Sequence, residues 1–217
     1  SIFGGIQSFD FSYAVAFPED IRNLTDPSSR RFLDDIVHVL SQTKMLFGSP
    51  EKIIYHRSRN NSAVGILQYD SGMIGTLRVI GGLEKIGPAE KLEVIGDGGL
   101  LILEHGERIT FHESGDPGSY GRDINFIRKD NTHTHQWSPD LRRPLGALSL
   151  HSHSLYGYIS ELREFVDSIH SKREPAHGNV NDTREIMNMY DAFANSEDNF
   201  FTLGSKVRQG LLKESPS

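Results

Sequence analysis

Alternation of apolar and polar residues is the first feature of the chain, and it predicts strands through its first half. Residues 6–17 carry apolar side chains at every second position, and the same period returns in several later segments. The turns Asp70-Ser71-Gly72 and Gly96-Asp97-Gly98-Gly99 each separate two of these segments. We expect further strands at 52–57, 63–69, 73–80, 90–95, 100–104 and 108–112, with a short one near 200–203.

Helical periodicity dominates elsewhere. Asp26-Pro27 provides an N-cap acceptor followed by a proline, and Gly48 with Pro50 ends the helix that this pair begins. A second helix begins near Tyr158, and a third runs from about residue 182 to 195. Residues 114–153 are rich in Gly, Pro, Asp, Asn and His, which predicts mainly long loops with one or two strands. The apolar positions of the first helix are Phe32, Leu33, Ile36, Val37, Leu40 and Phe47.

Strands in the middle and helices at the ends predict one α+β domain over residues 1–217. The sheet should be largely antiparallel and open-faced, with the helices on one face. Several strands carry apolar residues on both sides, so the second face also needs a cover. We therefore expect a homo-oligomer that forms through the open sheet face, or a domain partner.

Composition and charge narrow the class of protein. Hydrophobic residues make up 36% of the chain and charged residues 24%, as in a folded globular domain. The formal net charge of −6, without a basic patch, argues against a nucleic-acid partner. No apolar run reaches the roughly 20 residues that span a bilayer, so we expect no membrane partner. The chain has no cysteine, which suits the cytoplasm.

Asp34 and His38 carry the candidate chemistry of the first helix. Four residues separate them, so they lie on one face, and Ser41 continues the same stripe away from the apolar residues. A carboxylate beside an imidazole can orient a hydroxyl group and accept its proton, because histidine titrates near neutral pH. The alternative is a solvated ion pair that modestly stabilises the helix.

Two histidine pairs form a second candidate site. His133-Thr134-His135 and His151-Ser152-His153 place two imidazoles on one face if the backbone is extended, and together they could bind zinc. We expect no metal, because no acidic residue lies at a recognised ligand spacing from either pair. His153 and Tyr156 precede the second helix and are candidates to line a substrate pocket. Trp137, Arg142 and Arg143 could line it for an anionic substrate.

The segment Leu33-Asp34-Asp35-Ile36-Val37-His38-Val39-Leu40-Ser41, followed by Gly48, resembles the signature of the glucose–fructose oxidoreductase, inositol dehydrogenase and MocA family. Residues 66–75 resemble the hairpin of that family, residues 92–101 resemble its strand–turn–strand, and residues 161–196 resemble its closing helices. The resemblance covers about residues 6–203. It implies the fold of the family's C-terminal domain, which is like that of dihydrodipicolinate reductase.

The resemblance also implies a function. His38 would exchange the proton of the reacting hydroxyl, Asp34 would hold the substrate, and Ser41 would contact it. The chain would be the substrate-binding and oligomerisation half of a longer NAD- or NADP-dependent oxidoreductase that acts on a sugar, a cyclitol or a related hydroxy compound. The glycine fingerprint for a dinucleotide is missing, so we expect this part alone to bind no cofactor and to be inactive.

Two positions and one segment depart from the family signature. Ile36 replaces a glycine, where we expect it to crowd the approach to a nicotinamide, and Ser41 replaces a second aspartate. Ser28-Ser29-Arg30-Arg31 replaces a glycine-rich lead. The alternative from another class is a non-catalytic module that binds a ligand or a protein, and a weaker one is a metal-binding protein that uses the histidine pairs.

Overall fold

The computed structural model describes residues 4–58, 62–81, 90–106, 108–114, 134–138, 158–195 and 200–202. The chain divides into two compact units. The first comprises Ser1–Ser138 with Asn188–Ser217, and the second comprises Pro139–Met187.

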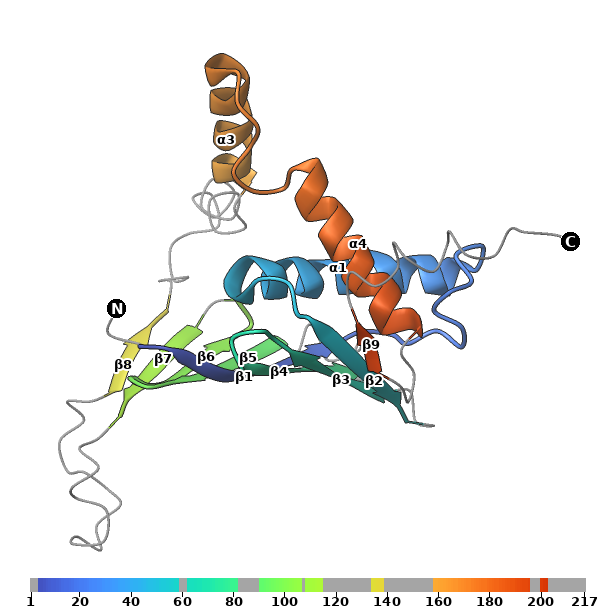
Figure 1. The fold of residues 1–217 in the computed structure, drawn as a ribbon, viewed down its shortest axis with the longest axis horizontal. Coiled ribbons are helices and arrows are strands. Elements are labelled where there is room, and N and C mark those ends of the chain that lie inside the picture. Colours follow the sequence, from blue (N-terminus) through green and yellow to red (C-terminus); the bar gives the residue numbers. More distant parts are fainter. Residues whose placement is uncertain are drawn as a thin grey trace, which may run out of the picture. The chain divides into compact units, whose positions relative to one another are not determined.

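A nine-stranded sheet organises the first unit (Figure 1). The strand order is β8-β7-β6-β5-β1-β4-β3-β2-β9. Strands β1 and β4 pair in parallel, and every other neighbouring pair is antiparallel, so the expectation of a largely antiparallel sheet in an α+β fold is confirmed. The strands are β1 (Ile6–Ala14), β2 (Lys52–Arg57), β3 (Ser62–Gln68), β4 (Ile74–Ile80), β5 (Glu90–Gly96), β6 (Gly99–Glu104), β7 (Arg108–Glu113), β8 (Thr134–Trp137) and β9 (Phe200–Thr202).

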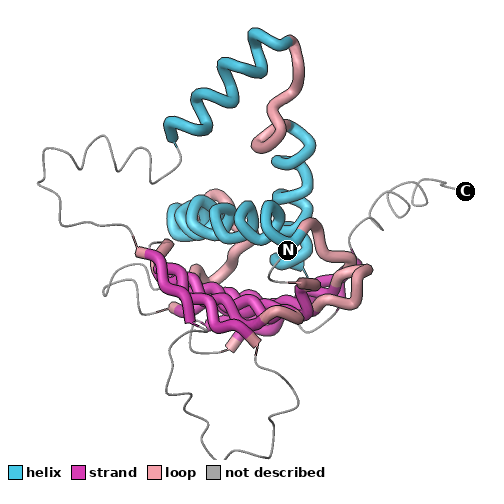
Figure 2. The backbone as a smooth tube through the Cα atoms, turned by 90° about the vertical axis from the view of Figure 1, so that its left-hand side faces the viewer, coloured by secondary structure: helices cyan, strands magenta, loops and turns pink. Residues whose placement is uncertain are grey.

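Helix α1 (Pro27–Phe47) covers one face of this sheet, as the two views in Figures 1 and 2 show. Its predicted ends are confirmed. The Asp26 side chain accepts a hydrogen bond from the backbone N–H of Ser28 at 3.0 Å, and Gly48 forms the C-cap with a φ of 81°. The buried face of the helix consists of Ser29, Phe32, Ile36, Val39, Leu40 and Thr43.

The apolar positions of α1 are buried to different degrees. Leu33 and Val37 are only half-buried, whereas Val39 is fully buried. The sheet lies against a narrower arc of the helix than the apolar positions alone suggest, so the two residues at its margin remain at the edge of the core. The first strand also ends earlier than expected, at Ala14, and Phe17 instead packs against the Phe32 ring at 4.7 Å between centroids.

The end of helix α4 (Val180–Asn195) completes the core of the first unit. Tyr190 donates a hydrogen bond from its hydroxyl to the carbonyl of Ile21 at 2.6 Å. The Phe193 ring lies 4.2 Å from that of Tyr55 on β2, and it leaves so little room that a Cβ at Gly65 would lie 3.2 Å from it. Residues from both ends of the chain therefore stabilise the same half of the sheet.

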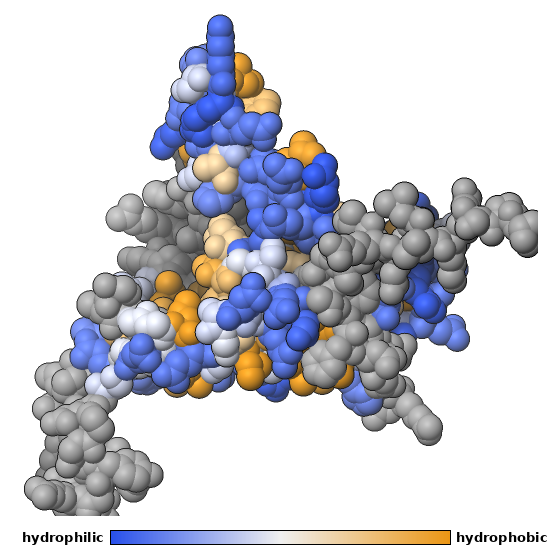
Figure 3. Space-filling view, viewed as in Figure 1, coloured by the Kyte–Doolittle hydropathy of each residue, from blue (hydrophilic) through white to orange (hydrophobic). Residues whose placement is uncertain are grey.

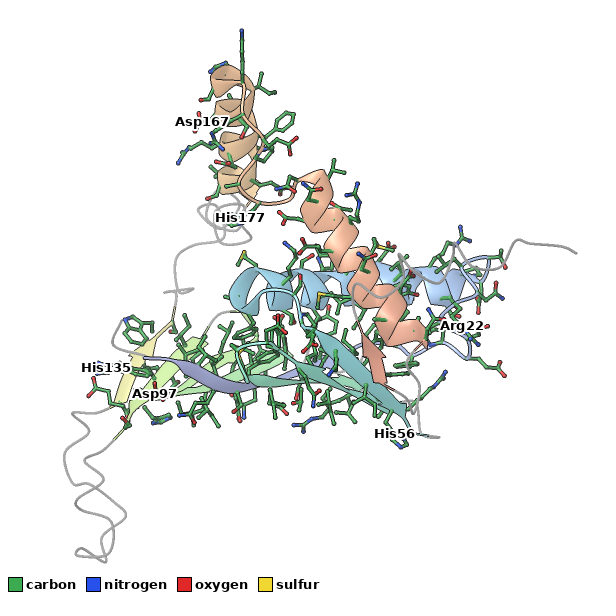
Figure 4. All side chains as sticks on the ribbon, in the orientation of Figure 1. Arg22, His56, Asp97, His135, Asp167 and His177 are labelled. Atoms are coloured by element: carbon green, nitrogen blue, oxygen red, sulfur yellow. The ribbon has the colours of Figure 1, made fainter. Side chains whose placement is uncertain are left out.

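The other face of the sheet carries a polar centre. Asp10 on β1 accepts hydrogen bonds from Thr76 and Arg78 on the neighbouring strand β4. Burial raises the pKa of Asp10, but the hydrogen bonds from Thr76 and Arg78 outweigh this effect and hold it below its usual value. Exposed isoleucines surround this centre, and His56 marks the same face in Figure 4. The exposed isoleucines are Ile66, Ile74 and Ile95.

The second unit contains helix α3 (Tyr158–Ser171) and the beginning of α4. Glu164 on α3 accepts hydrogen bonds from both terminal nitrogens of Arg173, at 2.8 and 3.1 Å, and from the backbone N–H of Ala176 at 2.9 Å. This carboxylate fixes the connection between the two helices. An apolar stripe runs along α3, and its residues Leu162 and Phe165 are exposed. Figure 3 shows hydrophobic side chains, in orange, on the surface of this helix.

Candidate functional site

The outer face of α1 carries the candidate catalytic residues. Asp34 and His38 are both exposed, on the side of the helix opposite the buried stripe that begins with Phe32. Ser41 is half-buried on the same outer face. The expectation that Asp34 and His38 lie outside the core is thus confirmed, and an exposed pair costs little to desolvate. Their roles in catalysis and binding remain predictions.

Asp34 and His38 do not form an ion pair with each other. Within the described part of the chain, no hydrogen bond or ion pair joins the two side chains, although their spacing places them one turn apart. Both polar groups therefore point to the surface with their hydrogen-bonding capacity available. A hydroxy compound lying along the helix could contact the carboxylate and the imidazole at once.

Ile36 does not lie on this outer face. Its side chain is fully buried, on the stripe that packs against the sheet. The expectation that Ile36 crowds the approach to a nicotinamide was therefore wrong for a physical reason. Its position on the helix turns it to the core, where an added side chain contributes packing.

Asp35 is a residue of this region that the sequence reasoning did not select. It is half-buried at the flank of α1, three residues before His38. Burial raises the pKa of Asp35 above its usual value, while the positive charges of His38 and Arg31 lower it and the negative charge of Asp34 raises it. The spacing of three residues was visible in the sequence, but the half-burial depends on the strand beneath the helix.

Three of the four paired histidines lie outside the described residues, namely His133, His151 and His153. The pocket candidate Tyr156 also lies outside them. His135 lies on β8, and its Nε2 is 2.9 Å from Oε1 of Glu113 on β7 (Figure 4). Within the described residues, no three His, Asp or Glu side chains gather in a way that could hold a metal ion.

The glycine-rich turn between β5 and β6 is part of the sheet. Gly99 begins β6 with a φ of 144°, and a Cβ there would lie 2.0 Å from the carbonyl oxygen of His112 on β7. Asp97 in the same turn holds the start of the chain, since it accepts hydrogen bonds from the backbone N–H of Gly5 and from Gln7 (Figure 4). A strand follows this turn, so it lacks the helix N-terminus that binds a pyrophosphate.

The arrangement of this sheet beneath α1 defines a fold. It is the fold of the C-terminal domain of oxidoreductases of the glucose–fructose oxidoreductase, inositol dehydrogenase and MocA type, as solved structures show. The resemblance drawn from the sequence is confirmed at the level of the fold.

Particular solved structures carry this comparison. The chain is similar to levoglucosan dehydrogenase in complex with NADH and L-sorbose, with a TM-score of 0.67 and 13% identity over 93% of this chain and 60% of that one. It is also similar to an oxidoreductase from Agrobacterium radiobacter in complex with NAD+, L-tartaric acid and magnesium, with a TM-score of 0.59 and 13% identity. That match covers 94% of this chain and 59% of the other.

A third similar structure is a probable dehydrogenase from Thermotoga maritima, with a TM-score of 0.59 and 16% identity over 94% of this chain and 58% of that one. The chain thus spans about 60% of the length of these structures. No family model and no curated protein matches the sequence. Within the described residues, each helix is too short or too polar to cross a membrane.

Proposed function

We propose that the chain is the substrate-binding and oligomerisation domain of an NAD(P)-dependent oxidoreductase that acts on a sugar, a cyclitol or a related hydroxy compound. The observation that carries this proposal is the exposed stripe of Asp34, His38 and Ser41 on α1 of this fold. The similar structures support it, since their names report NADH, NAD+ and small hydroxylated molecules.

Each residue of the stripe would have a distinct part. The carboxylate of Asp34 would accept a hydrogen bond from one substrate hydroxyl, and the imidazole of His38 would take the proton from the reacting hydroxyl. Ser41 would add a hydroxyl that both donates and accepts. Nicotinamide dinucleotide, bound by another domain, would be the hydride acceptor. The glycine-rich turn between β5 and β6 leads into a strand and does not fit its pyrophosphate, so this chain would contribute substrate binding and proton transfer.

The open sheet face would form the homo-oligomer. Exposed Ile66, Ile74 and Ile95 lie around the ion pair of Asp10 and Arg78, so this face offers both apolar area and a polar centre. We also propose a cytoplasmic location, because a chain without cysteine has no disulfides that require an oxidising compartment.

The alternative is a non-catalytic module that binds a ligand or a protein. The serine at position 41 favours it, as does the absence of a direct bond between the described side chains of Asp34 and His38. On this alternative the outer face of α1 would bind without proton transfer, and removing the imidazole would leave the affinity of the ligand nearly unchanged.

Binding of neutral polyols to the chain itself tests the proposal. We would titrate the ¹⁵N-labelled chain with levoglucosan, L-sorbose and myo-inositol, and follow the amide signals by NMR. We expect shifts at α1, with affinity reduced about tenfold or more in Asp34→Asn and His38→Ala, since each removes a hydrogen bond to a charged or strongly polar group. His177→Ala, an exposed histidine of the second unit, is the matched control. If no amide signal of α1 shifted up to the highest polyol concentration, the result would contradict the proposal.

A further inference from the structure

Charged side chains occupy the middle of the open sheet face. Strand β1 is the fifth of the nine strands, and Asp10 on it accepts hydrogen bonds from Thr76 and Arg78 on β4. On the other neighbouring strand, β5, Lys91 forms an ion pair with Glu93. These side chains alternate with the buried residues of their strands, so they lie on the face away from α1.

The strand register arranges these charges in rows across β5, β1 and β4. Ser12 pairs with both Arg78 and Lys91, which places the two bases at one level of the sheet. Asp10 pairs with Glu93, so the two acids lie at the next level, two residues away along the strands. The centre of the open face therefore carries a row of bases beside a row of acids.

Arg78 has hydrogen-bonding capacity for a further acid. Its Nη2 donates to both oxygens of Asp10, and within the described residues neither its Nε nor its Nη1 donates a hydrogen bond. The side chain is 53% exposed, so an acceptor from another molecule could reach these donors. A charged group that becomes buried in an interface needs such a partner, because desolvation of an unpaired charge is costly.

We propose that this charged centre selects a second copy of the chain and sets its direction, with the bases of one open face against the acids of the other. The inference rests on the proposed oligomerisation through this face. A two-fold axis that relates two packed faces lies in the plane between them. An axis along the strands would place each row on its own copy, base on base and acid on acid. The axis therefore crosses the strands, between the level of Ser12 and that of Asp10.

Apolar residues fit the same arrangement. An axis between these two levels places each residue against the residue at the mirrored level of the same strand. Ile74 then lies against Ile80 of the partner subunit, and Ile66 lies against Val64 of the partner subunit. The charged rows and the apolar residues around them are therefore complementary in one and the same orientation.

Charge-separated variants test the selection. The acid variant combines Arg78→Glu with Lys91→Glu, and the basic variant combines Asp10→Lys with Glu93→Lys. In sedimentation, we expect each variant alone to self-associate about a hundredfold more weakly than the wild type, because like charges meet across the interface. The equimolar mixture should recover the wild-type assembly. Arg30→Glu with Arg31→Glu, the same charge change on exposed residues of α1, is the control and should assemble as the wild type.

Two serines on β1 test the direction of the axis. The chain has no cysteine, so Ser12→Cys and Ser8→Cys each introduce a single thiol. Packed sheets lie about 10 Å apart and two residues of a strand span about 7 Å, so position 12 should lie about 12 Å from its copy and position 8 more than about 20 Å. A short bis-maleimide should join Ser12→Cys chains and leave Ser8→Cys chains largely unlinked. Equal linking of both would place the axis along the strands and overturn the inference.

These measurements separate the possible failures. A wild-type chain that stays monomeric at high concentration would overturn the proposed oligomerisation and this inference together. A wild-type oligomer whose acid variant still assembles alone would overturn the inference and leave the oligomerisation standing, and so would folded variants that fail to associate when mixed. Circular dichroism shows whether both variants fold, and if either does not, the cross-linking of the two serine variants decides.

Discussion

Gly75 is a residue at which the core limits side-chain size. A Cβ there would lie 2.1 Å from Cζ of Phe9, whose ring stacks on Phe47 at 3.9 Å between centroids. The two rings fix the end of α1 against β1 and β4. We expect Gly75→Ala to lower the free energy of unfolding by about 1–3 kcal/mol, because the ring must move away from its stacked position.

Urea unfolding measures this effect, and a double variant isolates its cause. In a Phe9→Leu background, Gly75→Ala should lower the free energy of unfolding by less than it does in the wild type, because the smaller side chain frees the space for the new Cβ. Gly65→Ala is a milder comparison, because its nearest contact is 3.2 Å. If Gly75→Ala lowered the free energy of unfolding equally in the wild type and in the Phe9→Leu background, the ring of Phe9 would not be the cause.

His38 and Phe32 belong to opposite faces of one helix, and their variants should separate function from folding. His38→Ala should change the free energy of unfolding by no more than about 0.5 kcal/mol, since the side chain is exposed. Phe32→Ala should cost about 3–5 kcal/mol, because the ring is fully buried. Thermal and urea unfolding of both variants measure the contrast, and a large loss in His38→Ala would make His38 a structural residue.

The sequence was sufficient to place Asp34 and His38 on the surface, because helical period alone separates them from the apolar positions. It was not sufficient to show that Asp35 is half-buried or that Ile36 faces the core. Which flank of a helix is half-buried depends on the sheet that lies against it, and β1 of this sheet precedes the helix in the chain. Contacts of this kind are set by the tertiary structure.

At the level of elements, the connection of α3 to α4 should depend on pH. Hydrogen bonds from Arg173 and from the backbone N–H of Ala176 hold the pKa of Glu164 at about 2, below its ordinary value of 4.5. Because the folded-state pKa is the lower one, the contact stabilises the connection above the ordinary pKa and is lost as the pH falls toward 2.

Amide hydrogen exchange at Ala176 measures this dependence. Between about pH 5 and 2 the protection of this amide, corrected for the intrinsic exchange rate, should fall in the wild-type chain. Glu164→Gln should show low protection throughout, and Glu161→Gln, an exposed acid one turn earlier, should behave as the wild type. Protection that stays constant down to the lowest pH in the wild type would contradict the contact.

The strands were predictable where they form hairpins. The boundaries of β2 to β7 follow from alternation and from turns such as that between β5 and β6, which are local features. The parallel pairing of β1 with β4 was not predictable, because no local turn specifies it. The position of β8 was not predictable either, since four exposed residues give almost no alternation signal.

At the scale of the whole molecule, the open sheet face should associate. Ile66→Glu with Ile74→Glu introduces charges on that face, and we expect wild-type chains to sediment as an oligomer and the double variant as a monomer. Met45→Glu, on the exposed surface of α1, is the control and should keep the wild-type state. A wild-type monomer at high concentration would contradict an oligomer through this face.

The chain by itself should not bind the dinucleotide. The turn from Gly96 to Gly99 leads into a strand, so no helix N-terminus is present there to hold a pyrophosphate. Calorimetry with NAD and with NADP should therefore give no binding in the micromolar range. Micromolar affinity for either would show that residues of this chain other than that turn form a cofactor site.

The central claim is that His38 exchanges a proton with the substrate, and turnover tests it most directly. The measurement is polyol oxidation by a protein that joins this chain to a nucleotide-binding domain, with His38→Ala compared with the wild type. We predict an intact fold and a loss of about two orders of magnitude or more in turnover, the usual scale for a general base. Normal turnover in a folded His38→Ala variant would contradict the account and favour the binding module.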